Sequence, residues 1–250
     1  MGGFFLLYAT KSCSICCYKT MANYLIIGAS SGIGAQIAKD LLLDGHQVWG
    51  SFRNHPITDS RINSFHFDSS DTSSRLPNDI PETIDGFVYC VGSISLVPIS
   101  RVNSNNLLLD IQNQLIKLVE ILQQLQPNLK RSSHASIVLF SSVAVQLGLP
   151  FHTQVGIVKG ALEGLAKSLA AEWAPSVRVN VIAPSLTDTP LAAGLLNTPE
   201  KKEANAQRHP LKRIGTVEDI SNIACFLLSE KSSWITAQVL HVDGGMQAIK

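Results

Sequence analysis

The sequence has few charged residues and no concentration of them. Charged side chains make up 16% of the 250 residues, and the formal net charge is +1. No dense stripe of Lys and Arg is present, which excludes the electrostatic footprint of a nucleic-acid-binding protein. No apolar run approaches the ~20 residues that a helix needs to span a bilayer. With 45% hydrophobic residues, the chain is instead typical of one folded α/β domain.

Residues 1–20 do not match the composition of the rest. They lack the positively charged start and long apolar core of a secretory signal. They hold three of the five cysteines, but no second ligand pair accompanies these to make a metal site: Cys13, Cys16 and Cys17. A coherent pattern begins at Met21 with "MANYLIIGASSGIG". We therefore interpret 1–20 as a disordered or non-native extension and 21–250 as the functional domain.

The other two cysteines, Cys90 and Cys225, lie in apolar surroundings. Such cysteines are typical of reduced core residues in a cytosolic protein, so we expect a cytoplasmic location.

From Tyr24 onward, short apolar strands alternate with segments of helical period. This alternation predicts βαβ units and therefore a doubly wound parallel sheet of about seven strands in a single Rossmann-type domain. Only about ten residues separate the second and third strands, close to the lower limit for a helical crossover. The expected strands are 24–27, 47–52, 62–67, 86–90, 136–141, 177–182 and 238–242. The expected helices are 33–43, 105–126, 153–173 and 217–229.

A glycine-rich turn lies between the first strand and the first helix. It reads Gly28-Ala29-Ser30-Ser31-Gly32-Ile33-Gly34. Glycines allow the backbone to turn sharply and to approach a pyrophosphate, and the helix that follows points its free N–H groups at the phosphates. This context predicts a dinucleotide-binding turn. The alternative is an ordinary tight connection between a strand and a helix.

Several motifs in order along residues 22–246 resemble the short-chain dehydrogenase/reductase family. The glycine spacing is the family's, although Ile27 stands where the family usually has Thr. Further similar segments are "SSVAVQLGLPFHTQVGIVKGALEGLAKSLAAEW", "RVNVIAPSLTDTP", "LKRIGTVEDI" and "WITAQVLHVDGG". The resemblance implies that the glycine turn, with Ser30, Ser31 and Ile33, holds a nicotinamide dinucleotide.

The second strand indicates which dinucleotide is preferred. NAD-selective sites usually place an acid about 20 residues after the turn, but no acid occurs between Gly45 and Thr58. Arg53 could instead bind a 2′-phosphate, so NADP is favoured over NAD. The alternative is that Arg53 only faces solvent. By resemblance, Asp68 would contact the adenine amino group, although an Asp here could equally form a turn.

The resemblance also implies an active site, with one departure. Ser142 would steady the substrate oxygen, and Lys159 would hold the nicotinamide ribose. The catalytic tyrosine position is occupied by Val155, which cannot transfer a proton. His152 is the best substitute, because it lies about one helical turn before Val155 and histidine as a residue type exchanges protons near neutrality. It could alternatively be a polar helix-start residue that never meets substrate.

Other positions have weaker assignments. Thr153 and Tyr89 are further candidates for the proton donor. The family's fourth active-site residue, an Asn, aligns with Asn113 or Gln114, which could also lie on a solvated helix face. The resemblance assigns three residues after the sixth strand to the cofactor: Pro184, Thr187 and Thr189. Ser185 replaces a common Gly, and 190–210 would form a substrate lid.

Three functions fit these observations. The first is an NADP(H)-dependent oxidoreductase that acts on a small carbonyl or alcohol with an unusual proton donor. The second is a catalytically impaired NADP(H)-binding sensor or scaffold. The third is an enzyme that reduces an activated C=C or C=N bond. We expect a homo-oligomer, a tetramer or dimer, through the helices at 105–126 and 153–173.

Overall fold

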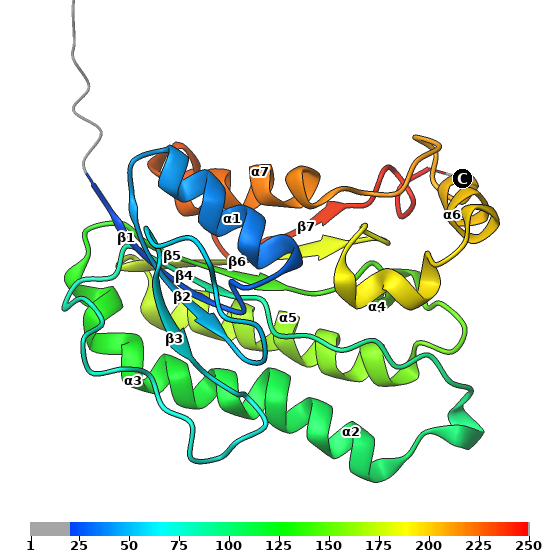
Figure 1. Ribbon diagram of the computed structural model, residues 1–250, viewed down its shortest axis with the longest axis horizontal. Helices are drawn as coiled ribbons and strands as arrows, with labels where there is room; N and C mark the ends of the chain where they lie inside the picture. The colour runs from blue at the N-terminus through cyan, green and yellow to red at the C-terminus, as the bar shows by residue number, and fades with distance from the viewer. Residues whose placement is uncertain (1–20, 250) are drawn as a thin grey trace, which may run out of the picture.

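The computed structural model describes residues 21–249, and the predictions for residues 1–20 lie outside this range. The chain forms three layers, a central parallel sheet with helices on both faces (Figure 1). This confirms the predicted doubly wound α/β fold. The seven strands are β1 (Asn23–Ile27), β2 (Gln47–Phe52), β3 (Asn63–His66), β4 (Gly86–Tyr89), β5 (Ala135–Phe140), β6 (Val177–Pro184) and β7 (Val239–Val242).

The strand order is β3-β2-β1-β4-β5-β6-β7, and every neighbouring pair is parallel. The order therefore reverses beside β1, which pairs with β2 on one side and with β4 on the other. From β1 the chain continues to β2 on one side of this point, and from β4 it continues to β5 on the other side. In open parallel sheets such a switch point leaves a crevice at the carboxyl ends of the strands.

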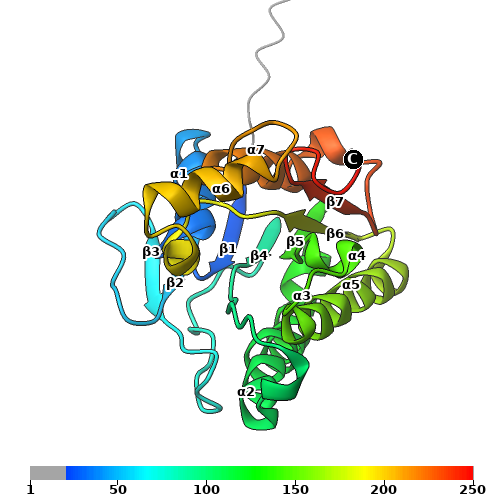
Figure 2. The ribbon, with the colours of Figure 1, turned by 90° about the vertical axis from the view of Figure 1, so that its right-hand side faces the viewer.

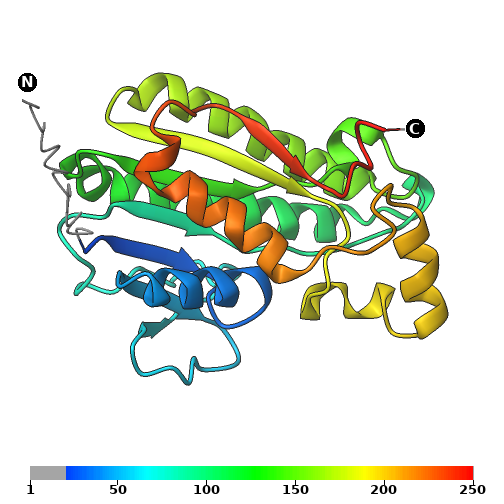
Figure 3. The ribbon, with the colours of Figure 1, turned by 90° about the horizontal axis from the view of Figure 1, so that it is seen from above.

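Each face of the sheet is covered by a pair of helices. The helices α1 (Gly32–Leu43) and α7 (Val217–Leu228) cover one face, and α3 (Lys117–Arg131) and α5 (Thr153–Trp173) cover the other (Figures 2 and 3). Buried apolar side chains at helical spacing make both contacts. On α3 these are Leu118, Ile121, Leu122, Leu125 and Leu129, and on α7 Ile220, Ala224, Leu227 and Leu228.

The long second helix differs from its prediction in two ways. It begins as α2 (Ser104–Ile111), passes through a π-helical segment (Gln112–Ile116), and continues as α3 to Arg131 rather than ending near Gln126. Pro127 lies inside α3 without ending it. Leu125 and Leu129 flank this proline and are fully buried, so packing holds the last turns in place.

Two other segments lie outside the expected strands and helices. The connection between β2 and β3 contains no helix, consistent with its short length. The segment 190–210, expected as a lid, holds the 3₁₀ helix η3 (Pro190–Leu195) and helix α6 (Pro199–Gln207). The remaining elements are 3₁₀ helices η1 (Ile99–Arg101) and η4 (Glu230–Ser232) and the short α4 (Ala144–Leu147). Within residues 21–249, none of the helices combines the length and apolar character needed to cross a bilayer.

Arg178 on β6 joins the sheet to the end of α7. Its guanidinium donates to the carbonyl oxygens of Leu227, Ser229 and Ser232 at 3.0–3.1 Å, and to Ser232 Oγ at 2.8 Å. The Leu227 carbonyl belongs to the last turn of α7, where intrahelical donors are missing, and the other two carbonyls follow that turn.

We expect Arg178→Ala to lower the free energy of unfolding by about 2–4 kcal/mol, because several half-buried acceptors lose a charged donor. Urea unfolding followed by circular dichroism measures this. Arg61→Ala is the matched control, since Arg61 pairs only with Asp59 in an exposed position and its loss should change little. Equal stability of the two variants would contradict the assigned role of Arg178.

Candidate functional site

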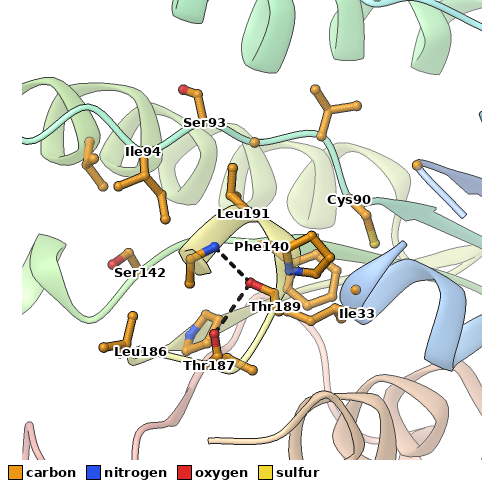
Figure 4. Close-up of a pocket in the computed structure, with 18 of the residues that line it drawn as sticks. Ile33, Cys90, Ser93, Ile94, Phe140, Ser142, Leu186, Thr187, Thr189 and Leu191 are labelled. Atoms are coloured by element: carbon orange, nitrogen blue, oxygen red, sulfur yellow. Dashed lines mark hydrogen bonds between the residues drawn. The ribbon is translucent and has the colours of Figure 1, made fainter. Parts of the chain in front are cut away.

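The carboxyl ends of β1, β4, β5 and β6 surround one large cavity of about 470 Å³, here called the main cavity. Figure 4 shows Ile33 at the start of α1, Cys90 where β4 ends, and Ser142 in the segment after β5, all around this space. The cavity is lined by most of the residues predicted for the site: Gly28, Ser30, Ser31, Gly32, Ile33, Gly34, Arg53, Ser142, His152, Lys159, Pro184, Thr187 and Thr189. Segments far apart in the sequence are therefore brought to one place, at the switch point of the sheet.

Two positions of the glycine turn require glycine, one for its backbone conformation and one for lack of space. Gly28 has a φ of +89°, in the left-handed region that favours glycine. A Cβ at Gly34 would lie 2.1 Å from the carbonyl oxygen of Gly28, so only glycine fits where α1 leaves the turn. The side chain of Ser31, the N-cap residue of α1, makes no capping hydrogen bond. The first N–H groups of α1 are thus left for a ligand, and this geometry suits a pyrophosphate.

Ser51, near the end of β2, holds the glycine turn through two hydrogen bonds. Its Oγ accepts a hydrogen bond from Gly28 N at 2.9 Å, and its carbonyl accepts one from Ala29 N at 2.9 Å. Ser51 is fully buried and also lines the cavity. This hydroxyl supplies a side-chain hydrogen bond to the turn although Ile27 stands where the resembling family has Thr. Nothing in the sequence pattern marked Ser51, because the contact joins two strands across the sheet.

Two residues are predicted to contact the adenosine half of the cofactor, and only one of them lines the cavity. Arg53 lines the main cavity just after β2 and is exposed. Asp68 is not among the lining residues, although its neighbours Phe67 and Ser69 are. Its carboxylate instead accepts hydrogen bonds from Ser70 N at 2.9 Å and Ser70 Oγ at 2.7 Å. This is the turn that the alternative interpretation described, and a contact of Asp68 with adenine stays a prediction.

Helix α5 brings the predicted catalytic positions to the same cavity. Val155 and Lys159 are one turn apart on α5, and both line the cavity with Ser142. Ser142 Oγ accepts a hydrogen bond from Ala144 N at 3.2 Å. Burial lowers the pKa of the Lys159 ammonium to about 8, while the nearby Asp110 carboxylate and Cys90 thiol oppose this shift. The site therefore combines a hydroxyl with a poorly solvated amine, and an apolar side chain lies between them in the sequence.

His152 stands at the N-cap of α5 and lines the cavity. Its Nδ1 lies 2.7 Å from the carbonyl oxygen of Pro150. A carbonyl can only accept, so Nδ1 carries the hydrogen and Nε2 is the ring nitrogen left to exchange a proton. The other candidate donors are less well placed. The hydroxyl of Tyr89 is buried and donates to the carbonyl of Asn113, and neither Tyr89 nor Thr153 is a lining residue.

A polar network missed by sequence reasoning surrounds the start of α5. Ser93 Oγ, which lines the cavity, donates to Asp110 Oδ1 at 2.6 Å and accepts from Gln114 Nε2 at 3.0 Å. Gln154 donates to the other oxygen of Asp110. A Cβ on Gly92 would lie 3.8 Å from Lys159 Nζ and 4.0 Å from Gln114 Oε1. Of the two residues aligned with the family's Asn, Gln114 is the one whose side chain joins this network, through Ser93.

The π-helical segment accounts for this placement of Gln114. Its extra residue shifts the helix so that Gln114 is buried under Gly92, while the carbonyl of Asn113 faces Tyr89. A helical repeat read from sequence assumes a constant 3.6 residues per turn. The sequence pattern therefore could not decide between the two positions.

The opposite end of the cavity is formed by the segment that follows α6. His209 is almost fully buried, and its Nδ1 lies 2.9 Å from the carbonyl oxygen of Asn205. Its Nε2 lies 2.8 Å from Ser185 Oγ. Arg208, which precedes His209 in the chain, is exposed and lines the cavity with His209, Asn205 and Ser185. Sequence reasoning noted Ser185 only as a departure, and nothing in the pattern pointed to its partner 24 residues away.

Thr187 and Thr189 lie side by side at the cavity, and Thr189 lies near Ile33 at the start of α1 (Figure 4). Thr189 Oγ1 accepts from Ala192 N and so caps η3, and it also donates to the carbonyl of Thr187. Thr187 forms a bridge with Gly215, which ties the loop to the segment before α7. The two threonines thus anchor the start of the expected lid.

Comparisons with known proteins agree with this geometry. A family model described as enoyl-(acyl carrier protein) reductase matches residues 28–247. A tropinone reductase homolog of Arabidopsis thaliana is 32% identical over 241 residues, which cover 90% of this chain and 92% of the relative. The solved aldohexose dehydrogenase of Thermoplasma acidophilum superposes with a TM-score of 0.82 at 26% identity, covering 92% of this chain and 95% of the other.

A short-chain type dehydrogenase/reductase of Mycobacterium ulcerans is also similar, with a TM-score of 0.79 at 28% identity, covering 92% of this chain and 90% of the other. The family model spans the glycine turn, both long helices and the loop after β6. The chain belongs to the short-chain dehydrogenase/reductase family.

Proposed function

We propose that this protein is an NADP(H)-dependent oxidoreductase that transfers hydride between the cofactor and a small carbonyl or alcohol substrate, with His152 as a non-standard proton donor. One observation carries the proposal. A single cavity is lined by the glycine turn and Arg53 at one end, and by Ser142, His152 and Lys159 further along.

The residues present fit the dinucleotide. The glycine turn leaves space for a pyrophosphate, and the uncapped N–H groups of α1 supply donors. Arg53 offers a planar set of donors for a 2′-phosphate, and no carboxylate lines this cavity among the described residues. Lys159 is buried where it would hold the nicotinamide ribose. When bound, NADPH would supply the hydride.

Two side chains of the protein would then act on the substrate, one by binding the carbonyl oxygen and one by supplying its proton. Ser142 would donate a hydrogen bond to the carbonyl oxygen and polarise it. His152, protonated at Nε2, would deliver the proton as negative charge develops on that oxygen. Its Nδ1–H stays bonded to Pro150 in both protonation states, which holds the ring in one orientation. In the oxidation direction, neutral His152 would accept the proton at the same nitrogen.

The second candidate is an NADP(H)-binding sensor or scaffold without turnover. It is favoured by Val155, whose apolar side chain lines the cavity at the position of the family's proton donor. The third possibility, reduction of an activated C=C or C=N bond, needs less help from a protein acid. Titration with NADPH followed by a screen of carbonyl substrates separates these functions, because a sensor binds the cofactor without turning over any of them.

We also propose a homo-oligomer, as expected from the two long helices. Leu108, Leu109 and Ile116 on one helix and Ile157 on the other are large apolar side chains that remain exposed. Such residues on neighbouring helices suit a symmetric contact between copies of this chain. A cytoplasmic location remains part of the same proposal.

Arg53→Ala should weaken NADPH binding about tenfold to a hundredfold and leave NADH binding nearly unchanged, because only NADPH carries the 2′-phosphate. Fluorescence titration of each cofactor measures both affinities. Arg131→Ala is the control, since Arg131 lies at the far end of α3 beside Glu82. An equal loss for NADH and NADPH would contradict the assignment of Arg53 to the 2′-phosphate.

The affinity for NADPH should fall as the pH rises through about 8. The pKa of Lys159 is lowered to about 8, so the ammonium is present below this pH and is lost above it. Bound cofactor favours the charged form, so affinity declines from the free protein's pKa upward. Lys159→Arg stays charged and should show no decline between pH 7 and 9. A wild-type affinity that is constant over this range would refute the prediction.

His152→Gln should lower kcat for carbonyl reduction by about 10²–10⁴-fold, because the positioned acid is removed while the helix start is kept. His134→Gln is the matched control, since His134 lies outside the cavity beside Glu230. Val155→Tyr in the His152→Gln background should restore part of the activity by supplying a phenol at the family's position. Steady-state kinetics measure all three, and full activity in His152→Gln would rule out the proposed donor.

A further inference from the structure

The cavity-lining side chains that can carry a charge near neutral pH are all basic: Arg53, His152, Lys159, Arg208 and His209. The thiol of Cys90 also lines the cavity, and it is uncharged because burial raises its pKa to about 12. Among the described lining residues none is Asp or Glu. A concave site lined by one sign of charge concentrates ligands of the opposite sign. The positive charge of Arg53 is explained by the proposed 2′-phosphate of the cofactor. Arg208 and His209 need another explanation, because they lie on the segment that follows α6.

Arg208 has donors left to offer. The contact that the structure gives it is a long one, with Nη1 3.4 Å from Asn205 Oδ1. No carboxylate of the described chain lies within ion-pair distance of it, whereas Arg61, Arg131 and Arg213 each have one. A guanidinium without an acidic partner at the edge of a cavity is suited to bind a carboxylate through two parallel hydrogen bonds.

Next to Arg208, Ser185 and His209 form a hydrogen-bonded pair. Only 3% of His209 is exposed, and its ring is fixed between the Asn205 carbonyl and Ser185 Oγ. Ser185 also lies 3.2 Å from Met246 Sδ. When Nε2 donates to Ser185 Oγ, the hydroxyl donates to Met246 Sδ, a weak acceptor that a carboxylate oxygen could replace.

This pair lies next to the proposed reaction centre. Val143 N donates to the carbonyl of Pro184 at 3.1 Å, so the segment carrying Ser142 runs beside the one carrying Ser185. A molecule with its carbonyl at Ser142 would therefore extend toward Ser185, His209 and Arg208. Most members of the resembling family have Gly at position 185, which has no hydroxyl to offer.

We propose that Arg208, Ser185 and His209 bind a carboxylate of the substrate, so that the substrate is an oxo acid in the reducing direction and a hydroxy acid in the oxidising direction. The inference rests on the proposed function. Hydride from NADPH goes to the carbonyl carbon, the proton from His152 goes to its oxygen, and the carboxylate is unchanged. A carboxylate is favoured over a phosphate dianion because Arg208 caps the C-terminal end of α6, where the helix carries partial negative charge.

The test compares straight-chain oxo acids with their methyl esters. The acids separate the carbonyl from the carboxylate by zero, one or two methylene groups, and each ester keeps the same carbonyl without the charge. We expect kcat/KM for the best acid to exceed that of its ester by at least about tenfold. Arg208→Gln should raise KM for that acid about tenfold and also lower its kcat, and it should change the ester's kinetics much less.

Three further variants sharpen the test. Arg208→Lys should give an intermediate KM, since the charge stays and the planar pair of donors is lost. Ser185→Gly, the usual residue of the family, should also reduce the preference for the acid. Lys201→Gln is the matched control, because Lys201 is a cation on α6 that does not line the cavity, and it should behave as wild type. Thermal melting of each variant confirms that it is folded.

Several outcomes would overturn the proposal. Esters that react as well as the acids would do so, and so would a loss of NADPH affinity in Arg208→Gln without substrate, which would assign this cation to a cofactor phosphate. NADPH binding with turnover of neutral carbonyls alone would remove the carboxylate site and leave the proposed oxidoreductase intact. Absence of NADPH binding in the wild type would remove both, and binding with no turnover would favour the sensor.

Discussion

The contact between Gly28 and Gly34 is the constraint on which the site depends. Helix α1 leaves the turn so close to β1 that the Gly28 carbonyl lies 2.1 Å from where a side chain at Gly34 would begin. This close approach aims the start of α1 at the crevice between β1 and β4. A wider turn would tilt the helix and move its free N–H groups away from the carboxyl edge of the sheet. The positions of Arg53, Ser142 and Lys159 have a functional meaning only relative to this edge.

Most of the fold could be predicted because it is encoded locally. Alternation of apolar strands with helical segments gave the parallel sheet, and α5 was predicted with its observed bounds from Thr153 to Trp173. The helix at 105–126 was predicted too short because Pro127 normally ends a helix. Tertiary burial of Leu125 and Leu129 overrides that local preference, and a single sequence does not show how well these residues pack.

The site residues also fall into two groups, those encoded by local motifs and those brought together only by the fold. The glycine turn, Ser142 and Lys159 lie in motifs with fixed spacing, so they could be assigned to one cavity before the structure was described. Ser51, Ser93 and His209 could not, because their partners are brought close by the sheet and by α6 rather than by sequence spacing. Asp68 shows that a matching motif does not decide a residue's role. Its carboxylate is bonded to Ser70 and it does not line the cavity, so its contact with adenine stays a prediction.

If Val155 occupies the family's tyrosine position, as the resemblance implies, the remaining groups in the proposed active site must do more. Tyrosine both places a proton donor and points it at the substrate oxygen, and valine does neither. In the proposal the acid is His152 at the N-cap of α5 and not position 155 in the first turn, so other contacts must orient the substrate oxygen toward Nε2. Anchoring a charged group of the substrate away from the reacting carbon supplies such orientation, because binding energy from a remote group lowers the entropy lost at the reacting centre. The proposed second binding point at Arg208 and His209 therefore fits the proposed use of His152 in place of tyrosine.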